Sequence, residues 1–270
     1  MPWPILAHQA PVLPLKWWRP AAFNGTALVI GSIAPDFEYL TVEVPTDSAF
    51  PHSLAGQFLF CLPVTMAIVV LIGWLHLGNV ISARMGGRFT WLADAATDVM
   101  AKGGWWKAVG SALIGSCSHV AFDHVTHAWI PLMLPAVRYR VGSLVFGATA
   151  ISQLAASGEG ALLSLLFLSR LARRSARVPV PRKPGGTIIV AFAAIGVGVG
   201  IVHSLPLIRS PDAYFDAGAF YVWGAVGFEV ACGLALGVLL AAVLLVARDL
   251  LKPNGAAPRP STTPESVVGK

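Results

Sequence analysis

Long apolar stretches alternate with short polar connections over most of this chain. About five of them are long enough to form membrane-spanning helices, since roughly 20 apolar residues cross the hydrocarbon core of a bilayer. The apolar pattern places these helices at Leu54–Gly78, Trp105–Ile130, Leu144–Leu171, Thr187–Ile208 and Phe220–Ala247. The sequence therefore predicts an all-α fold, a polytopic membrane helical bundle.

Two shorter apolar arms precede the first of these helices. Residues 5–15 and 22–35 lie on either side of the sequence KWWRP at 16–20. At 1.5 Å per residue the arms reach only about 16 and 21 Å, which is less than the thickness of the hydrocarbon core. We expect a re-entrant helical hairpin, which would bring His8 beside Asp36. The alternative is one spanning helix after an irregular N-terminal segment, which would separate these two residues.

The segments between the helices are polar or interrupted by proline. They are predicted to be a loop over residues 34–53, a polar connection over residues 79–104 with a short amphipathic helix at Trp91–Ala101, and a second loop over residues 131–143. Pro63 is expected to kink the first spanning helix, and Pro131 to end the second.

Composition agrees with a membrane protein. Hydrophobic residues make up 56% of the chain and charged residues 12%, with a mean hydropathy of +0.69; soluble domains carry roughly a quarter charged residues. We expect one integral membrane domain over residues 1–252, with the lipid bilayer as its partner, and a disordered tail over residues 253–270. The net charge of +6 is assigned to loops, so no nucleic-acid partner is predicted.

The positive charges predict how the helices are oriented. The most basic loop, residues 170–183, is expected on the cytoplasmic side. Alternation along the chain then leaves only Arg138, Arg140 and Arg209, of 19 Lys and Arg, on the outer side. The sequence therefore predicts a protein of the cytoplasmic (inner) membrane with a cytoplasmic C-terminus.

Three polar residues recur every four positions within one of the apolar helices. His119, Asp123 and His127 share a narrow stripe, because four residues turn a helix slightly more than once. The predicted orientation places Asp36 and His52 at the same membrane face. Mixed imidazole and carboxylate ligands suit a divalent metal, Zn²⁺ or Mn²⁺. The competing explanation is a helix end that carries His and Asp because it emerges into water.

The order of these motifs resembles that of the membrane-bound metal-dependent hydrolase-like proteins. Those proteins carry an early His, then PDxD, THS and SHxxxDxxT. The matching residues here are His8, Pro35-Asp36, His52-Ser53, Ser118-His119, Asp123 and Thr126. Two positions depart from the pattern: Glu38 replaces the second Asp of PDxD, and Pro51 replaces the Thr of THS.

The whole chain is more similar still to a bacterial membrane family named domain of unknown function 4184. The similarity is carried by HQAPVLPL at the start, by ALVIGSIAPDFEY and by FPHSLAGQFLFCLPV. It covers residues 1–135 well and the last three helices loosely. The resemblance implies a metal site more strongly than it implies a reaction.

The leading hypothesis is a membrane-embedded metal-dependent hydrolase acting at the outer face on a lipid-like or phosphoester substrate. The expected ligands are His8, Asp36, His52, His119 and Asp123, with His127 as a further ligand or a supporting residue. Glu38 or Glu229 is expected to accept the proton of the attacking water.

Two other classes of function are compatible with the same residues. A transporter of a metal ion or proton could use Glu159, Glu229 and His203 as a relay across the bilayer. A non-catalytic membrane protein could keep a metal only to hold the N-terminal hairpin in place. The chain has no P-loop, no GxSxG motif and no Rossmann fingerprint, which disfavours nucleotide and serine-hydrolase chemistry.

Overall fold

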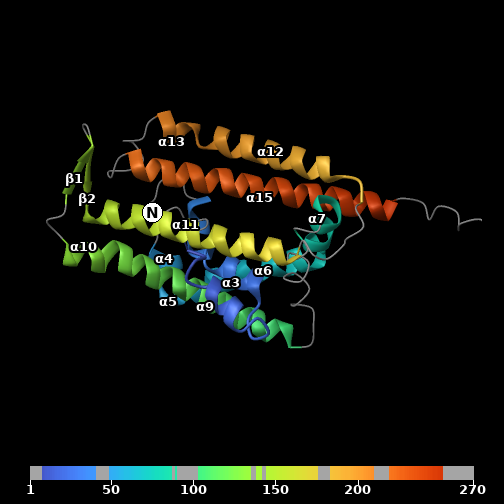
Figure 1. Cartoon of the computed structure of the whole chain (residues 1–270), viewed down its shortest axis with the longest axis horizontal. Helices are drawn as coiled ribbons and strands as arrows, with labels where there is room; N and C mark the ends of the chain where they lie inside the picture. The colour runs from blue at the N-terminus through green and yellow to red at the C-terminus, as the bar shows by residue number, and fades with distance from the viewer. Residues whose placement is uncertain are drawn as a thin grey trace, which may run out of the picture.

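The long helices of this protein lie along one common axis (Figure 1). They are α9 (Gly104–His124), α11 (Ala148–Ser175), α12 (Gly186–His203) and α15 (Ala219–Leu251). The computed structural model describes residues 8–40, 49–86, 89, 103–134, 138–141, 144–175, 183–209 and 219–251. Within these residues the regular secondary structure is helical apart from one short β-hairpin, so the predicted all-α class is confirmed.

The N-terminal segment folds into two short helices, α2 (Leu13–Trp18) and α3 (Gly25–Gly31). Lys16 closes the turn between them, because its ammonium group donates to the carbonyls of Pro20 at 2.7 Å and Phe23 at 2.8 Å. The predicted helical hairpin is therefore present, and the alternative of a single spanning helix is wrong.

Helix α3 runs parallel to α9 in close backbone contact. The backbone N–H of Asn24, at the start of α3, donates to the hydroxyl of Ser111, about two turns into α9, at 2.9 Å. One turn further along, a Cβ atom added to Gly115 would lie 2.5 Å from the carbonyl oxygen of Leu28. Small residues allow this approach, as they do between membrane helices generally. The crossing fixes the position of the hairpin against α9.

The first long apolar helix is assembled from several pieces. They are α4 (Ala49–His52), α5 (Leu54–Gly56), the π-helical turn η2 (Gln57–Cys61) and α6 (Leu62–Trp74). The π turn comes just before Pro63, where a kink was expected. The helix ends at Trp74 rather than Gly78, because His76 adopts a left-handed conformation with φ of 46°. A separate helix, α7 (Leu77–Met85), follows. It begins within the predicted span and continues into the predicted polar connection.

Helix α9 continues beyond the point at which it was expected to end. A π-helical turn, η4 (Val125–Trp129), joins it to α10 (Ile130–Met133). Pro131 was expected to terminate the helix, and this prediction is wrong. The proline lies in the first turn of α10, where a helix requires no N–H donor.

A short antiparallel hairpin follows, at one end of the molecule (Figure 1). Strands β1 (Arg138–Val141) and β2 (Leu144–Gly147) pair with Arg138 opposite Gly147. The predicted loop over residues 131–143 and the predicted helix start at Leu144 are therefore incorrect here. Pairing with β1 holds Leu144–Gly147 in an extended conformation, so α11 begins at Ala148.

Helices α12 and α15 form an antiparallel pair (Figure 1). A Cβ atom added to Gly196 would lie 2.1 Å from the carbonyl oxygen of Gly233, so the glycine-rich sequence allows close packing as expected. Helix α12 ends at His203, five residues before the predicted end at Ile208, and α13 (Leu205–Arg209) follows.

Four described helical segments are long and apolar enough to cross a membrane, which makes this a multi-pass membrane protein. They are Leu54–Trp74, Ile151–Arg173, Gly186–His203 and Gly224–Leu251. The fifth predicted span, Trp105–Ile130, is helical but does not belong to this group, because its polar stripe lowers its hydropathy. The predicted helix at Trp91–Ala101 and the predicted tail over 253–270 lie outside the described residues.

Candidate metal centre

The polar stripe of α9 faces the N-terminal hairpin through His119. Its ring is fully buried, and its Nδ1–H donates to the carbonyl oxygen of Ser32, just after α3, at 2.9 Å. Because a carbonyl only accepts hydrogen bonds, Nδ1 carries a proton, and in the neutral ring the lone pair is on Nε2. That Nε2 lies 3.3 Å from an oxygen of Asp123 and 3.6 Å from an oxygen of Asp36.

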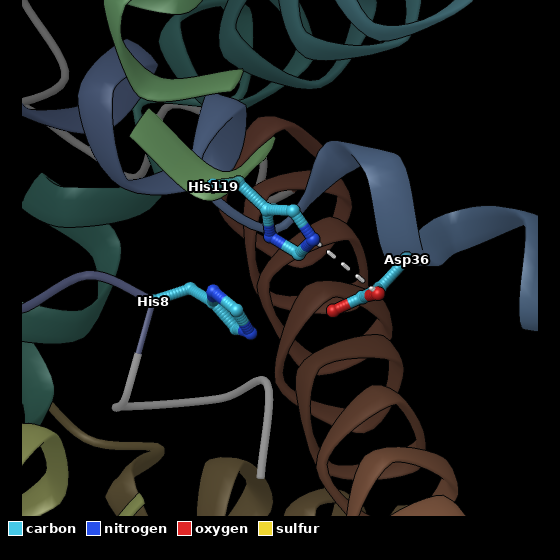
Figure 2. A group of neighbouring side chains, drawn as sticks. All are labelled: His8, Asp36 and His119. Atoms are coloured by element: carbon cyan, nitrogen blue, oxygen red, sulfur yellow. Dashed lines mark ion pairs between the residues drawn. The ribbon is translucent and has the colours of Figure 1, made fainter. Parts of the chain in front are cut away.

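The hairpin supplies a carboxylate and a second imidazole to this place. Asp36 lies in the 3-10 helix η1 (Ala34–Leu40), is buried, and faces His119 (Figure 2). The ring of His8 stacks on the ring of His119 with centroids 3.9 Å apart. Its Nε2 is 3.7 Å from an oxygen of Asp123. The hairpin therefore brings His8 and Asp36 together, as predicted.

Burial sets the charge preference of these two hairpin residues. Desolvation raises the pKa of the Asp36 carboxyl group above its usual range and lowers the pKa of the His8 imidazole. Both shifts disfavour the charged form. The neutral imidazole is the form that binds a metal, whereas the carboxyl group must lose its proton to do so.

His52 reaches the cluster from the end of α4. Its Nε2 lies 3.7 Å from an oxygen of Asp123. The surrounding turn is held by Gln57, whose amide donates to the Pro51 carbonyl at 2.6 Å, and by the Ser53 hydroxyl, which accepts from the N–H of Gly56 at 3.0 Å. These contacts hold the turn that carries His52. The turn is therefore held without the hydroxyl of the threonine that Pro51 replaces.

His127 adjoins the same carboxylate from the π turn η4. Its Nδ1–H donates to the backbone carbonyl of Asp123 at 2.9 Å, and the same nitrogen is 3.5 Å from a carboxylate oxygen of that residue. His124 takes a different direction, with its ring edge against Trp129. Of these two neighbouring histidines, His127 is therefore the one that contacts Asp123.

Two groups of three side chains offer ligand atoms within 4.8 Å of one another. The groups are His8, Asp36 and His119, and His52, His119 and Asp123. Four buried ligand atoms of these residues have no hydrogen-bond partner within the described part of the chain: His8 Nδ1, Asp36 Oδ2, His119 Nε2 and Asp123 Oδ1. The arrangement therefore gathers unsatisfied lone pairs of the types that bind a divalent cation.

Of the two predicted bases, Glu229 is described and is not part of these groups. Glu229 forms an ion pair of 2.8 Å with His203, between α15 and α12. Glu38 lies in η1 two residues after Asp36, but its side chain is outside the described part of the structure. Their catalytic roles stay predictions.

Sequence reasoning did not identify the backbone contact that orients His119. A contact made by a backbone carbonyl, such as that of Ser32, cannot be recognised from the type of side chain. The sequence signal for this contact is the glycines where α3 and α9 cross. Gly31 and Gly115 precede Ser32 and His119 by one and four positions. Close helix contact at these glycines places the carbonyl within reach of the imidazole.

Comparison with known proteins gives a family but no characterised relative. No curated protein and no solved structure matches the chain. The sequence model of one family matches residues 1–245, which extends the similarity well beyond the first 135 residues and into the last helix. The chain belongs to the family described as domain of unknown function (DUF4184).

Proposed function

We propose that this protein binds one divalent metal ion through His8, Asp36, His52, His119 and Asp123, and that the metal serves a hydrolytic reaction at the membrane. The unsatisfied buried atoms of the cluster carry the proposal. Each buried polar atom without a partner costs about 1–3 kcal/mol. A cation held among these side chains would satisfy unpaired acceptors of this kind.

The tautomer of His119 favours a single ion. Its one available lone pair, on Nε2, belongs to both three-residue groups, and a lone pair binds one metal. Bonds of about 2.1 Å place neighbouring ligand atoms about 3 to 3.5 Å apart. The separations from His119 Nε2 to Asp36 and Asp123 are 3.6 and 3.3 Å, close to this spacing.

The ligand chemistry favours Zn²⁺, with Mn²⁺ as the second choice. Imidazole nitrogen suits zinc, whereas manganese prefers more oxygen ligands than the two carboxylates supply. The Ser32 carbonyl orients His119 in the way that outer ligands orient metal-binding histidines.

The cluster is closed on one side and open on the other. The side chains of His8, Asp36 and His119 are at most 4% exposed, whereas those of His52 and Asp123 are 23% and 22% exposed. Water and substrate would therefore approach from the side of His52 and Asp123. A bound divalent ion supplies Lewis acidity, which activates water near neutral pH.

Three residues of the chain are proposed to assist this chemistry. His127 holds the backbone of Asp123 and is itself partly exposed on the open side. Glu38 is the preferred candidate base, because η1 carries it beside Asp36. Glu229 is the weaker candidate, since its carboxylate already pairs with His203. On the predicted orientation, the open side faces out of the cytoplasmic membrane.

Metal analysis of the detergent-purified protein tests the binding step. We expect about one zinc or manganese ion per wild-type chain and less than a tenth of that in His119→Ala and Asp123→Ala. His203→Ala is the matched control and should keep the wild-type content. A wild-type protein with no stoichiometric metal, or variants with unchanged content, would contradict the proposal.

Turnover separates a catalytic metal from a structural one. A structural role is favoured by one observation: the buried ligands join the hairpin to α9. If the metal is catalytic, the loaded protein should hydrolyse bis-p-nitrophenyl phosphate or p-nitrophenyl phosphate, and a chelator should abolish the activity. If it is structural, the chelator should lower the thermal stability of the protein while no turnover is found before or after.

A further inference from the structure

An open groove of about 670 Å³ leads to the exposed side of the cluster. One wall is a single face of α9 and η4, on which Cys117, Val120, Ala121 and Ala128 recur at helical spacing. The other wall comes from the residues between α4 and η2, including Leu54. The volume is in the range of small-molecule binding sites.

The groove is apolar along its length and polar at one end. Cys117, Val120, Ala121 and Leu54 form the apolar part, and Leu54 is 76% exposed. The polar end is formed by His52, Asp123 and His127, the partly exposed side of the cluster. A ligand that fills it would be an amphiphile with its polar group at the metal ligands.

The position of the groove along α9 places its apolar part inside the bilayer. Trp105 and Trp106 are exposed at the start of α9, and exposed tryptophans favour the membrane interface. Asp123 is 17 and 18 positions further along, which is about 27 Å at 1.5 Å per residue, close to the ~30 Å thickness of the hydrocarbon core. The cluster therefore lies near the opposite boundary, and Cys117 and Val120 lie deeper.

The polar end suits an anionic headgroup. Asp123 is the one acidic residue among the described residues that line the groove, and it is a proposed metal ligand. His124 also lines the groove and belongs to neither three-residue ligand group. Imidazole N–H groups and a divalent cation both bind phosphate oxygens.

We propose that the substrate of this site is a long-chain lipid carrying a phosphate ester, which reaches the cluster sideways from the bilayer. The acyl chain lies along Val120, Ala121 and Leu54, and the phosphate lies at Asp123 and His52. This inference rests on the proposed metal-dependent function and names the substrate class for that same site.

Protection of Cys117 from a thiol reagent tests occupancy of the groove. Cys117 is exposed and lines the groove, while Cys232 is partly buried and does not line it, so it serves as an internal reference. Metal-loaded protein is treated with a maleimide, and labelling of each cysteine is followed by peptide mass spectrometry. Hexadecyl phosphate, ethyl phosphate and hexadecanol are compared at equal concentration.

We expect hexadecyl phosphate to slow labelling of Cys117 at least fivefold, and ethyl phosphate and hexadecanol to slow it less than twofold. Equal protection by ethyl phosphate would overturn the lipid part of the proposal, and equal protection by hexadecanol would overturn the phosphate part. No protection by hexadecyl phosphate, in protein that binds metal and hydrolyses p-nitrophenyl phosphate, would overturn this inference alone. Protection without metal or turnover would leave lipid binding and remove the hydrolase function.

Filling the groove gives a second, independent test. In Ala121→Trp the indole would occupy the apolar part, while Ile114→Trp adds the same side chain to an exposed position of α9 outside the groove. Release of phosphate from dioleoyl phosphatidate should fall more than tenfold in Ala121→Trp and less than twofold in Ile114→Trp. Both variants should keep the wild-type metal content. An Ala121→Trp protein that retains metal and full lipid turnover would contradict the assigned groove.

Discussion

Two helix pairs in this protein, one parallel and one antiparallel, both have closely approaching backbones but differ in what they position. Helix α3 meets α9 at Gly115, and α12 meets α15 at Gly196 and Gly233, in each case with backbones in direct contact. The first pair positions the buried imidazole of His119 through the Ser32 carbonyl. The second pair packs with α7 around an apolar core of Val80, Ile189, Ala241, Ala242 and Leu245.

The difference shows what close packing contributes to the site. Backbone contact between membrane helices is a general means of association and carries no function by itself. In the first pair it brings a free carbonyl to an imidazole, which fixes the tautomer and the direction of the lone pair. In the second pair an ion pair joins His203 of α12 to Glu229 of α15, and its histidine side chain is 67% exposed. The following variants test this contrast, in order of decreasing effect.

Gly115→Ala should disturb both the fold and the site. The new Cβ would lie 2.5 Å from the Leu28 carbonyl oxygen and 2.9 Å from the Ser32 nitrogen, so α3 has to move away. We expect a loss of about 1–3 kcal/mol of stability, with metal affinity reduced by more than tenfold, because His119 loses its orienting partner. Thermal unfolding and metal titration measure the two effects. Gly110→Ala is the control, since its Cβ meets nothing within 4 Å.

Gly196→Ala should weaken the fold but leave the site intact. Its Cβ would lie 2.1 Å from the Gly233 carbonyl oxygen, which forces α12 away from α15. We expect a similar loss of stability, about 1–3 kcal/mol, with unchanged metal content per folded chain. Gly198→Ala, on the open side of the same helix, should behave like wild type. Loss of metal in Gly196→Ala would show that the two helix pairs are coupled and that the packing of α12 against α15 also supports the site.

His127→Ala should weaken the metal site without changing the fold. It removes the hydrogen bond to the Asp123 carbonyl, and losing such an outer contact typically costs 10–100-fold in affinity. We expect about a tenfold loss, measured by competition with a chelator, and little change in melting temperature. His124→Ala should change the affinity less than twofold, because His124 lies about one helical turn from His127 and its ring contacts Trp129. A similar loss in both variants would point to a general effect of the helix end.

His203→Ala should have the smallest effect. An ion pair with one exposed partner contributes about 0–1 kcal/mol, and the pair lies outside both ligand groups. Melting temperature, metal content and hydrolysis should all stay close to wild type. A large fall in hydrolysis with unchanged metal content would instead support Glu229 as the base.

Local spacing in the sequence predicted much of the candidate site. The four-residue repeat of His119, Asp123 and His127 requires only a helix, so the shared stripe followed from periodicity. The hairpin and its pairing of His8 with Asp36 followed from arms too short to span a bilayer. The roles of Glu38 and Glu229 could not be derived in this way, because they depend on where separate elements meet.

Local breaks in the helices could not be predicted from the apolar pattern. The left-handed His76, the continuation past Pro131 and the strand at Leu144–Gly147 all lie in apolar or mixed segments. The mean hydropathy of such a segment does not show whether its backbone forms hydrogen bonds with a neighbouring segment. For that reason the apolar pattern places each of these boundaries several residues away from its position in the structure.

By itself the sequence determined the helical class, the membrane environment and the repeat of His and Asp side chains on one helix, because each depends on composition or on spacing along one element. Only the tertiary structure decided which ligand atoms face one another. It placed the Ser32 carbonyl against His119, closed the cluster on the side of His8 and Asp36, and left His52 and Asp123 open to a groove. These features arise from contacts between distant segments, and such contacts are set by helix packing rather than by local pattern.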